Sequence, residues 1–233
     1  MTTAPARIAV LASGRGSNLQ ALLDAIAAGS LAARVVGVFS DRPGAPALAR
    51  VEPAQRWGQA PSVFADRAAF EQAMAAAIDA VAPDWIVCAG YMRILGAAFV
   101  QRYAGRLVNI HPSLLPRHRG LHTHAQALAA GDSEHGASVH FVVPELDAGA
   151  VIAQAEVPVL PGDTPEALAA RVLEREHPLL VASLQWLAAG RVTERDGQVF
   201  VDGQCLFSPL RLDCQDKLTS PPASTHRRHG ARA

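Results

Sequence analysis

The chain has 233 residues, half of them apolar, which is enough for one large domain or two small ones with a sizeable core. Its 21 Lys and Arg balance its 21 Asp and Glu, which argues against a protein drawn to nucleic acid by bulk charge, although a local site for one phosphate stays open. No apolar run reaches transmembrane length, the first residues lack a signal-peptide pattern, and the 3 cysteines lack CxxC spacing. We expect a cytoplasmic protein with small-molecule substrates and with neither nucleic acid nor a membrane as partner. The sequence leaves open whether it is a monomer or a homodimer.

A short apolar run over residues 7–12 predicts a buried strand, and the glycine-containing loop 13–18 and a helix with Leu19, Leu22 and Ile26 on one face follow it. The glycines allow the backbone close to an anion, and the start of the helix offers free N–H groups. Leu19 stands where a dinucleotide motif needs its third glycine, and no Lys follows as in a Walker A loop. The loop therefore predicts a site for a single phosphate, with an ordinary tight turn as the alternative.

Apolar runs and helical patterns alternate through the next hundred residues. Strands are predicted at 35–40, 62–64, 85–89 and 106–108, and helices at 47–56, 67–81 and 97–103, with Asp66 as the cap of the second. The loop 90–95 is unusually apolar and could line a ligand pocket or simply pack on the core. Strands that are apolar on both faces and alternate with helices predict an α/β fold with a doubly wound, mostly parallel sheet.

Asn109 and His111 follow directly after the strand at 106–108. Side chains alternate along a strand, so these two point to the same side. In an open α/β sheet, ligands bind beyond the carboxyl ends of the strands. An amide and an imidazole that converge there suit the stabilisation of charge on an oxygen during attack on a carbonyl. The alternative is that both residues only stabilise a turn.

The rest of the chain predicts a helix at 123–130, strands at 137–143 and 151–159, and a helix at 165–189 that Pro178 should kink or split. A hairpin with an Asp-Gly turn is expected at 192–201. His118, His122 and His124 could suggest a metal site, but they match no organised ligand set, so we expect no metal and solvated loop histidines. We predict a single domain over 1–207, with an antiparallel extension of the sheet, and a disordered tail over 208–233, where Pro, Ser, Arg and His predominate.

Six segments together resemble the phosphoribosylglycinamide formyltransferase family, within the folate-dependent formyltransferases of Rossmann-like fold. They are 13–18, 90–95, 109–116, 120–124, 136–141 and 146–149, and the resemblance covers roughly residues 7–206 in the same order. It implies transfer of a formyl group from 10-formyltetrahydrofolate, as co-substrate, to the amine of phosphoribosylglycinamide in purine synthesis. The alternatives are a formyltetrahydrofolate hydrolase of the same fold, a phosphate-binding module without activity, and a metal hydrolase.

The resemblance also assigns roles to residues. It implies that Asn109, His111 and Asp147 are catalytic, because a carboxylate beside the imidazole favours its protonated, donating form. It implies an N-terminal half that binds phosphate and a C-terminal half that binds folate. Leu173 stands where a polar residue is expected. The implied contacts to phosphoribosylglycinamide are Gly16, Ser17, Asn18 and Glu176, and those to folate are Arg67, Met92, Arg93, Ile94, Leu95, Asn109, Val143, Pro144, Glu145, Leu146 and Asp147.

Overall fold

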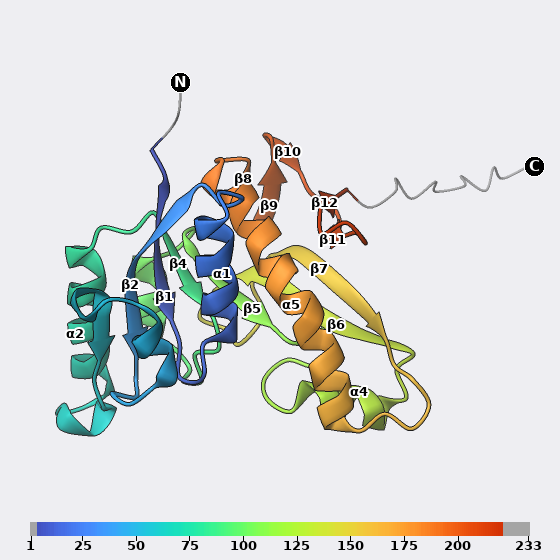
Figure 1. Cartoon of the computed structure of the whole chain (residues 1–233), viewed down its shortest axis with the longest axis horizontal. Coiled ribbons are helices and arrows are strands. Elements are labelled where there is room, and N and C mark those ends of the chain that lie inside the picture. The colour runs from blue at the N-terminus through green and yellow to red at the C-terminus, as the bar shows by residue number, and fades with distance from the viewer. Residues whose placement is uncertain (1–3, 221–233) are drawn as a thin grey trace, which may run out of the picture.

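A computed structural model describes residues 4–220. Within this range nine strands form one twisted sheet in the order β12-β11-β7-β6-β5-β4-β1-β2-β3, and all but β6 and β12 run in the same direction (Figure 1). The sequence-based prediction of a mostly parallel sheet with an antiparallel extension is confirmed. The strands are β1 (Ala6–Leu11), β2 (Ala33–Ser40), β3 (Arg56–Gly58), β4 (Trp85–Cys88), β5 (Leu107–His111), β6 (Glu134–Phe141), β7 (Val151–Pro158), β11 (Leu210–Leu212) and β12 (Leu218–Thr219).

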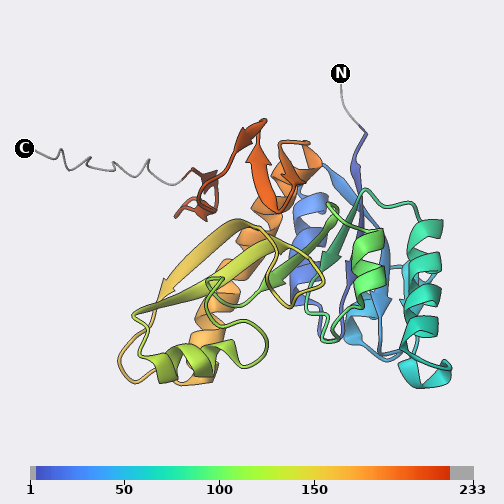
Figure 2. The same cartoon turned by 180° about the vertical axis from the view of Figure 1, so that it is seen from behind.

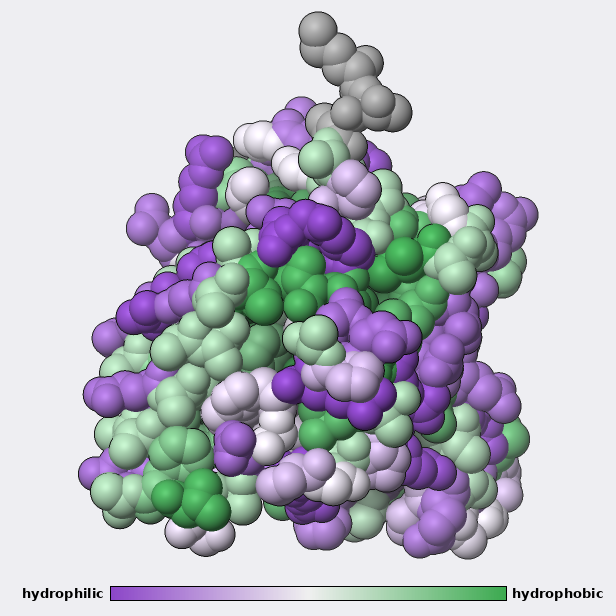
Figure 3. Space-filling view, turned by 60° about the vertical axis from the view of Figure 1, so that its left-hand side comes forward, coloured by the Kyte–Doolittle hydropathy of each residue, from purple (hydrophilic) through white to green (hydrophobic). Residues whose placement is uncertain are grey.

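Helices cover both faces of this sheet, as Figures 1 and 2 show from opposite sides. Strand alternation divides the core in two: in β1, Ile8 and Val10 pack in the layer with α1 and α5, whereas Ala9 and Leu11 pack with α2 and α3. On the face seen in Figure 3, hydrophobic residues gather mainly in the recessed upper centre and hydrophilic residues cover much of the periphery. The helices are α1 (Ser17–Ala27), α2 (Arg67–Ala80), α3 (Ala97–Arg102), α4 (Thr123–Ala130) and α5 (Pro165–Ala188).

The direction of winding reverses between β1 and β4, the central neighbours from which the chain builds outward on both sides. Ligands of such sheets bind at this point, beyond the carboxyl ends of the strands. Ser13 ties the loops there together. Its N–H donates to the Gly90 carbonyl (3.0 Å), its hydroxyl donates to Asp41 Oδ1 (2.5 Å), and the same hydroxyl accepts from the Met92 N–H (2.9 Å). The loops after three neighbouring strands are thereby held in one arrangement.

Two local predictions were wrong for the same reason. Instead of a helix at 47–56 and a strand at 62–64, the chain forms three short 3-10 turns, Pro46–Arg50, Pro53–Gln55 and Pro61–Val63, with β3 between the last two. Each turn begins with a proline, which starts a helical turn readily but cannot continue one. Asp66 does cap α2, because its Oδ1 accepts from the Ala69 N–H (2.8 Å).

Helix α5 is not split at Pro178. Buried residues on both sides of the proline, among them Val172 and Leu180, pack against the sheet and against α1, and this burial outweighs the loss of one backbone hydrogen bond. The hairpin is confirmed as β8 (Val192–Arg195) and β9 (Gln198–Val201). With β10 (Gln204–Cys205) they form a small antiparallel sheet. Among residues 4–220 no helix has the length and apolar composition that a membrane span requires.

The chain continues to form strands beyond the boundary predicted at residue 207. Strand β11 pairs in parallel with β7, Leu210 is fully buried, and Arg211 forms an ion pair with Glu156 of β7. The sequence pattern missed this strand because it is only three residues long, too short to show periodicity. Residues 210–212 and 218–219 therefore add two strands to the sheet, and residues 221–233 of the predicted tail lie outside the described range.

The buried position of Leu210 gives a test of this edge. Leu210→Ala should lower the free energy of unfolding by about 2–4 kcal/mol, because it removes a buried side chain and leaves a cavity. Phe207→Ala is the matched control, since Phe207 is 94% exposed, and should change stability by less than about 0.5 kcal/mol. Urea unfolding of both variants measures this. Equal stabilities would contradict the placement of β11.

Candidate active site

The largest described cavity opens at the carboxyl edge of the sheet and has a volume of about 580 Å³. Loops after β4 and β5 and the turn between β6 and β7 form its wall, and α1 and α5 each contribute one polar residue. Its mouth carries exposed apolar side chains, including Met92, Ile94 and Leu146, a feature typical of ligand sites. The predicted residues that line it are Asn18, Met92, Arg93, Ile94, Leu95, Asn109, His111, Val143, Pro144, Leu146, Asp147 and Glu176.

His111 is buried at the end of β5 and is held through both ring nitrogens. Its Nε2 lies 3.0 Å from the carbonyl oxygen of His118, and its Nδ1 lies 3.5 Å from Asp147 Oδ2. A carbonyl only accepts hydrogen bonds, so Nε2 carries a proton in every state of the ring. Nδ1 is therefore the nitrogen that is not engaged by the backbone, and the Asp147 carboxylate is the group that faces it.

The turn that carries Asp147 is built to hold this position. Asp147 has a left-handed backbone (φ 48°), which Asp tolerates better than most residues. Its Oδ2 accepts from the Gly120 N–H (2.8 Å). Two residues on, a Cβ at Gly149 would lie 1.8 Å from the Phe141 carbonyl oxygen, so only glycine lets the turn close against β6.

Asn109 is oriented by a second buried histidine, which sequence analysis did not identify as a site residue. His140 lies opposite Asn109 in the antiparallel pairing of β5 and β6. Its Nδ1 is 2.8 Å from the Phe141 carbonyl oxygen and therefore carries the proton, and its Nε2 is 3.1 Å from Asn109 Nδ2. Burial lowers the pKa of His140 to about 4. At neutral pH its Nε2 accepts from Asn109, and the 3.7 Å separation from Asp147 Oδ1 is not an ion pair.

This arrangement fixes the direction of the Asn109 amide. One Nδ2 hydrogen goes to His140, so the other remains to donate toward the cavity. The sequence signal that could have identified His140 is a histidine on an apolar strand, between Val139 and Phe141. The structure also brings Tyr91, Gly120, Leu121, His122, Thr123 and His124 to the cavity, none of which was assigned a role.

The opposite end of the cavity is polar. Asn18 Nδ2 donates to Glu176 Oε2 (3.0 Å), whereas Asn18 Oδ1 is buried without a partner. Burial raises the pKa of Glu176. Just before Asn18, Gly16 has φ 73° and no side chain caps the start of α1, so its first N–H groups are open to an anion. A Cβ at Gly16 would lie 2.8 Å from Ala47 Cβ, so the loop needs glycine here.

Four assigned residues do not line the cavity: Gly16, Ser17, Arg67 and Glu145. Arg67 supports the loop 90–95 from outside the cavity, where its Nη2 donates to the Ile94 carbonyl (2.5 Å) and its Nε donates to Glu71 Oε1 (2.8 Å). Glu145 is exposed beside Arg119 (3.5 Å). Leu173, where a polar residue was expected, is also absent from the lining.

The sequence predicted that His118, His122 and His124 are solvated loop histidines, but two of them make side-chain contacts. His118 Nε2 lies 2.7 Å from Asp132 Oδ2, and His124 Nδ1 lies 3.1 Å from His135 Nε2. Only His122 of the three is exposed. Across residues 4–220, no three or more His, Cys, Asp and Glu side chains are arranged to hold a metal ion.

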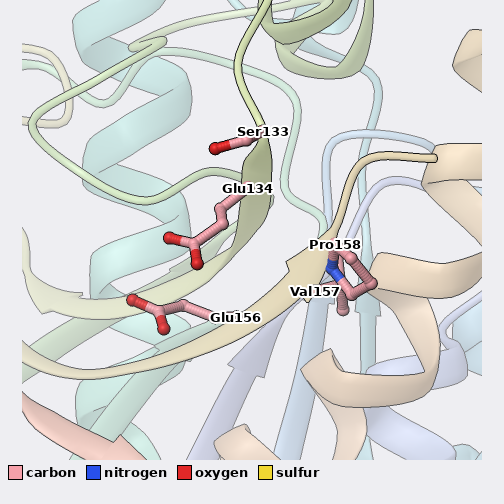
Figure 4. A pocket seen from close by; sticks show the side chains of 5 residues that line it. All are labelled: Ser133, Glu134, Glu156, Val157 and Pro158. Carbon is pink, nitrogen blue, oxygen red and sulfur yellow. The ribbon is translucent and has the colours of Figure 1, made fainter. Parts of the chain in front are cut away.

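A second, smaller cavity of about 290 Å³ lies beside β6 and β7 (Figure 4). The carboxylates of Glu134 and Glu156 project to the same side, whereas Pro158 lies apart from them. Arg211 already neutralises Glu156. This cavity has half the volume of the first and is lined by only five residues, so the larger cavity is the candidate active site.

Comparison with known proteins agrees with this geometry. Residues 6–184 match the sequence model of the Formyl transferase family. The chain is 48% identical over 204 residues to the phosphoribosylglycinamide formyltransferase of Escherichia coli K12, across 85% of this chain and 95% of that protein. The solved phosphoribosylglycinamide formyltransferase of Coxiella burnetii is 48% identical and superposes with a TM-score of 0.82, covering 87% of this chain and 96% of that one.

The chain is thus a member of the formyl transferase family. Within it, it belongs to the phosphoribosylglycinamide formyltransferases. A formyltetrahydrofolate deformylase of Pseudomonas syringae has the same fold with a TM-score of 0.75, but it is only 27% identical and this chain covers 65% of it.

The neutral state of His140 predicts a pH dependence of stability. Its folded pKa of about 4 lies below the usual value near 6.5, so the unfolded chain takes up the proton first as pH falls. Stability should therefore decrease between about pH 6.5 and 4, and the slope of unfolding free energy against pH should be shallower in His140→Gln. Urea unfolding at several pH values tests this, with His122→Gln as the exposed control. Identical slopes in wild type and His140→Gln would contradict the assignment.

Proposed function

We propose that the protein transfers the formyl group of 10-formyltetrahydrofolate to the amine of phosphoribosylglycinamide, a step of purine synthesis. The observation that carries this proposal is the convergence of Asn109, His111 and Asp147 in one cavity, between an apolar mouth and the polar Asn18–Glu176 pair. The names of the similar proteins support the same activity. A formyl donor whose ring system has apolar faces and a small phosphorylated acceptor fit these two ends.

The two substrates would occupy opposite ends of the cavity. Folate would lie against Met92, Arg93, Ile94 and Leu95 and against the turn 143–147, including Glu145, with Arg67 behind the first loop. The phosphate of the acceptor would bind to the N–H groups of Gly16, Ser17 and Asn18 at the start of α1. Glu176 would contact the ribose hydroxyls or the amine. The acceptor amine would then face the formyl carbon near Asn109.

The chemistry follows from the hydrogen-bonding groups. The amine attacks the formyl carbon and negative charge develops on the formyl oxygen. The free Nδ2 hydrogen of Asn109 and the Nδ1 hydrogen of protonated His111 would donate to that oxygen, since both side chains line the cavity. When the intermediate collapses, the bond from carbon to the folate nitrogen breaks. The amine loses one proton and the departing nitrogen gains one, while Asp147 stabilises the imidazolium.

Measuring tetrahydrofolate release with and without phosphoribosylglycinamide tests the proposal. Release should depend on the acceptor amine and should produce formylated acceptor in equal amount. Release at the same rate without the acceptor would show a formyltetrahydrofolate hydrolase instead.

The proposed roles of His111 and Asp147 predict losses in turnover rather than in binding. His111→Ala removes a donor to the developing oxyanion and should lower kcat by roughly 100- to 1,000-fold, with KM for both substrates within about threefold. Asp147→Asn should also lower kcat and should shift its pH profile, because the amide no longer stabilises the imidazolium. Asp163→Asn, outside the cavity, is the control. A normal rate and pH profile in Asp147→Asn would contradict the coupling.

The proposed role of Glu176 predicts a loss specific to one substrate. Glu176→Gln should raise KM for phosphoribosylglycinamide by about tenfold, since hydrogen bonds to charged groups contribute about 1.5–3 kcal/mol, and should leave KM for the folate unchanged. Glu174→Gln is the matched control, because Glu174 lies two residues earlier on α5 and is exposed. An equal rise of KM for both substrates would argue against acceptor binding at Glu176.

A further inference from the structure

The hydrogen bond that holds His111 Nε2 comes from the backbone of an irregular loop, so the loop itself must be held. His118, whose carbonyl oxygen accepts this bond, has a left-handed backbone (φ 55°) and lies in no helix or strand. A backbone carbonyl in such a segment is free to turn unless other contacts fix the residue. The side chain of His118 provides such a contact.

His118 Nε2 lies 2.7 Å from Asp132 Oδ2, and both side chains are mostly buried, with 13% and 16% of their surface exposed. The hydrogen bond from His118 is the largest of the effects that lower the pKa of Asp132, so the carboxylate is charged at neutral pH. Charge-assisted hydrogen bonds of this length are about twice as strong as neutral ones.

Asp132 is itself fixed to regular structure. It follows Gly131, which ends α4 in the left-handed conformation, and its N–H donates to the Ala127 carbonyl (3.1 Å). Arg117 Nη1 approaches the same carboxylate at 3.4 Å, and the Arg117 carbonyl accepts from the Ser113 hydroxyl (2.7 Å). The loop is thus joined at one side to the end of α4 and at the other to the residues just after β5.

We propose that the His118–Asp132 pair is a positioning device for His111: by fixing the His118 carbonyl against the end of α4, it keeps the proton of the catalytic imidazole on Nε2 and leaves Nδ1 to the reaction. The inference rests on the proposed function only for the chemical role of Nδ1. The contact that holds the His111 ring through Nε2 does not depend on that function. His118 and Asp132 do not line the cavity, and the contact that connects this pair to the site is the one between the His118 carbonyl and His111 Nε2.

The surroundings of His111 show what else could influence it. Asp147 from the turn after β6, His140 from β6, His124 from α4 and Glu176 from α5 are the titratable groups that face it. None of these contacts Nε2, whose partner is the His118 carbonyl. Loss of that partner would leave Nε2 without the acceptor that fixes the orientation of the ring, so kcat should fall.

Four variants separate positioning from binding. Asp132→Ala removes the anchor, and His118→Asn keeps a residue type that adopts positive φ but is too short to reach Asp132. Each should lower kcat about tenfold, less than the roughly 100-fold that a displacement of 1 Å can cost, and leave KM within about twofold. The double variant should be no worse than either single one, because both break the same contact. Asp132→Asn, which can still accept from His118 Nε2, should retain most of the activity.

Nuclear magnetic resonance of protein with ¹⁵N-labelled histidine gives a reading that needs no turnover. The Nε2-bound proton of His111, assigned by its loss in His111→Gln, should shift or broaden in Asp132→Ala and His118→Asn. It should be unchanged in Asp163→Asn. This control variant breaks the ion pair of Asp163 with Arg171, which is comparably buried but lies away from the site. This reading separates the positioning role from the proposed function, since it is valid even if formyl transfer is absent.

The proposal is overturned if the resonance and kcat stay as in wild type in both single variants. It is also overturned if the two losses are additive, or if KM rises while kcat is unchanged. Thermal unfolding of each variant establishes that the protein is folded, and the Asp132→Asn variant keeps the test decisive if Asp132→Ala does not fold.

Discussion

The site depends on one hydrogen bond, from His111 Nε2 to the carbonyl of His118. Because that oxygen only accepts, the bond places a proton on Nε2 and directs Nδ1 toward Asp147 and the cavity. A neutral ring without this partner could carry its proton on either nitrogen. The same logic applies to His140, whose Nδ1 is committed to the Phe141 carbonyl and whose Nε2 therefore accepts from Asn109. In both histidines a backbone carbonyl thus determines which ring nitrogen carries a proton. The other ring nitrogen is then left to contact a side chain of the site.

The antiparallel part of the sheet makes this possible. Strand β5 ends a set of parallel strands, and β6 returns beside it so that Asn109 and His140 are direct partners. Because β6 and β7 are also antiparallel, a short turn joins them, whereas two parallel strands would need a long crossover connection. The turn after β6 then carries Asp147 back over His111, closed tightly at Gly149. On the other side of the cavity, Ser13 holds the loops after β1, β2 and β4 together.

Sequence reasoning identified what local patterns determine. Alternation alone placed Asn109 and His111 on the same side, and helical periodicity and capping located α2 and its Asp66 cap. Asp147 was recognised only by family resemblance, because 36 residues separate it from His111 and no local pattern joins them. The tautomer of His140, the His118–Asp132 pair and the three-residue strand β11 were missed, since each depends on neighbours that are distant in sequence. Prolines at 46, 53 and 61 produced 3-10 turns where propensity indicated a helix and a strand.

A crystal structure with a formyl-folate analogue and phosphoribosylglycinamide bound together is the most direct measurement of this account. The account predicts the formyl oxygen within hydrogen-bonding distance of Asn109 Nδ2 and His111 Nδ1, the acceptor amine facing the formyl carbon, and the phosphate at the start of α1. A formyl group bound away from both nitrogens, or a His111 ring whose Nε2 faces the formyl oxygen in place of the His118 carbonyl, would contradict it.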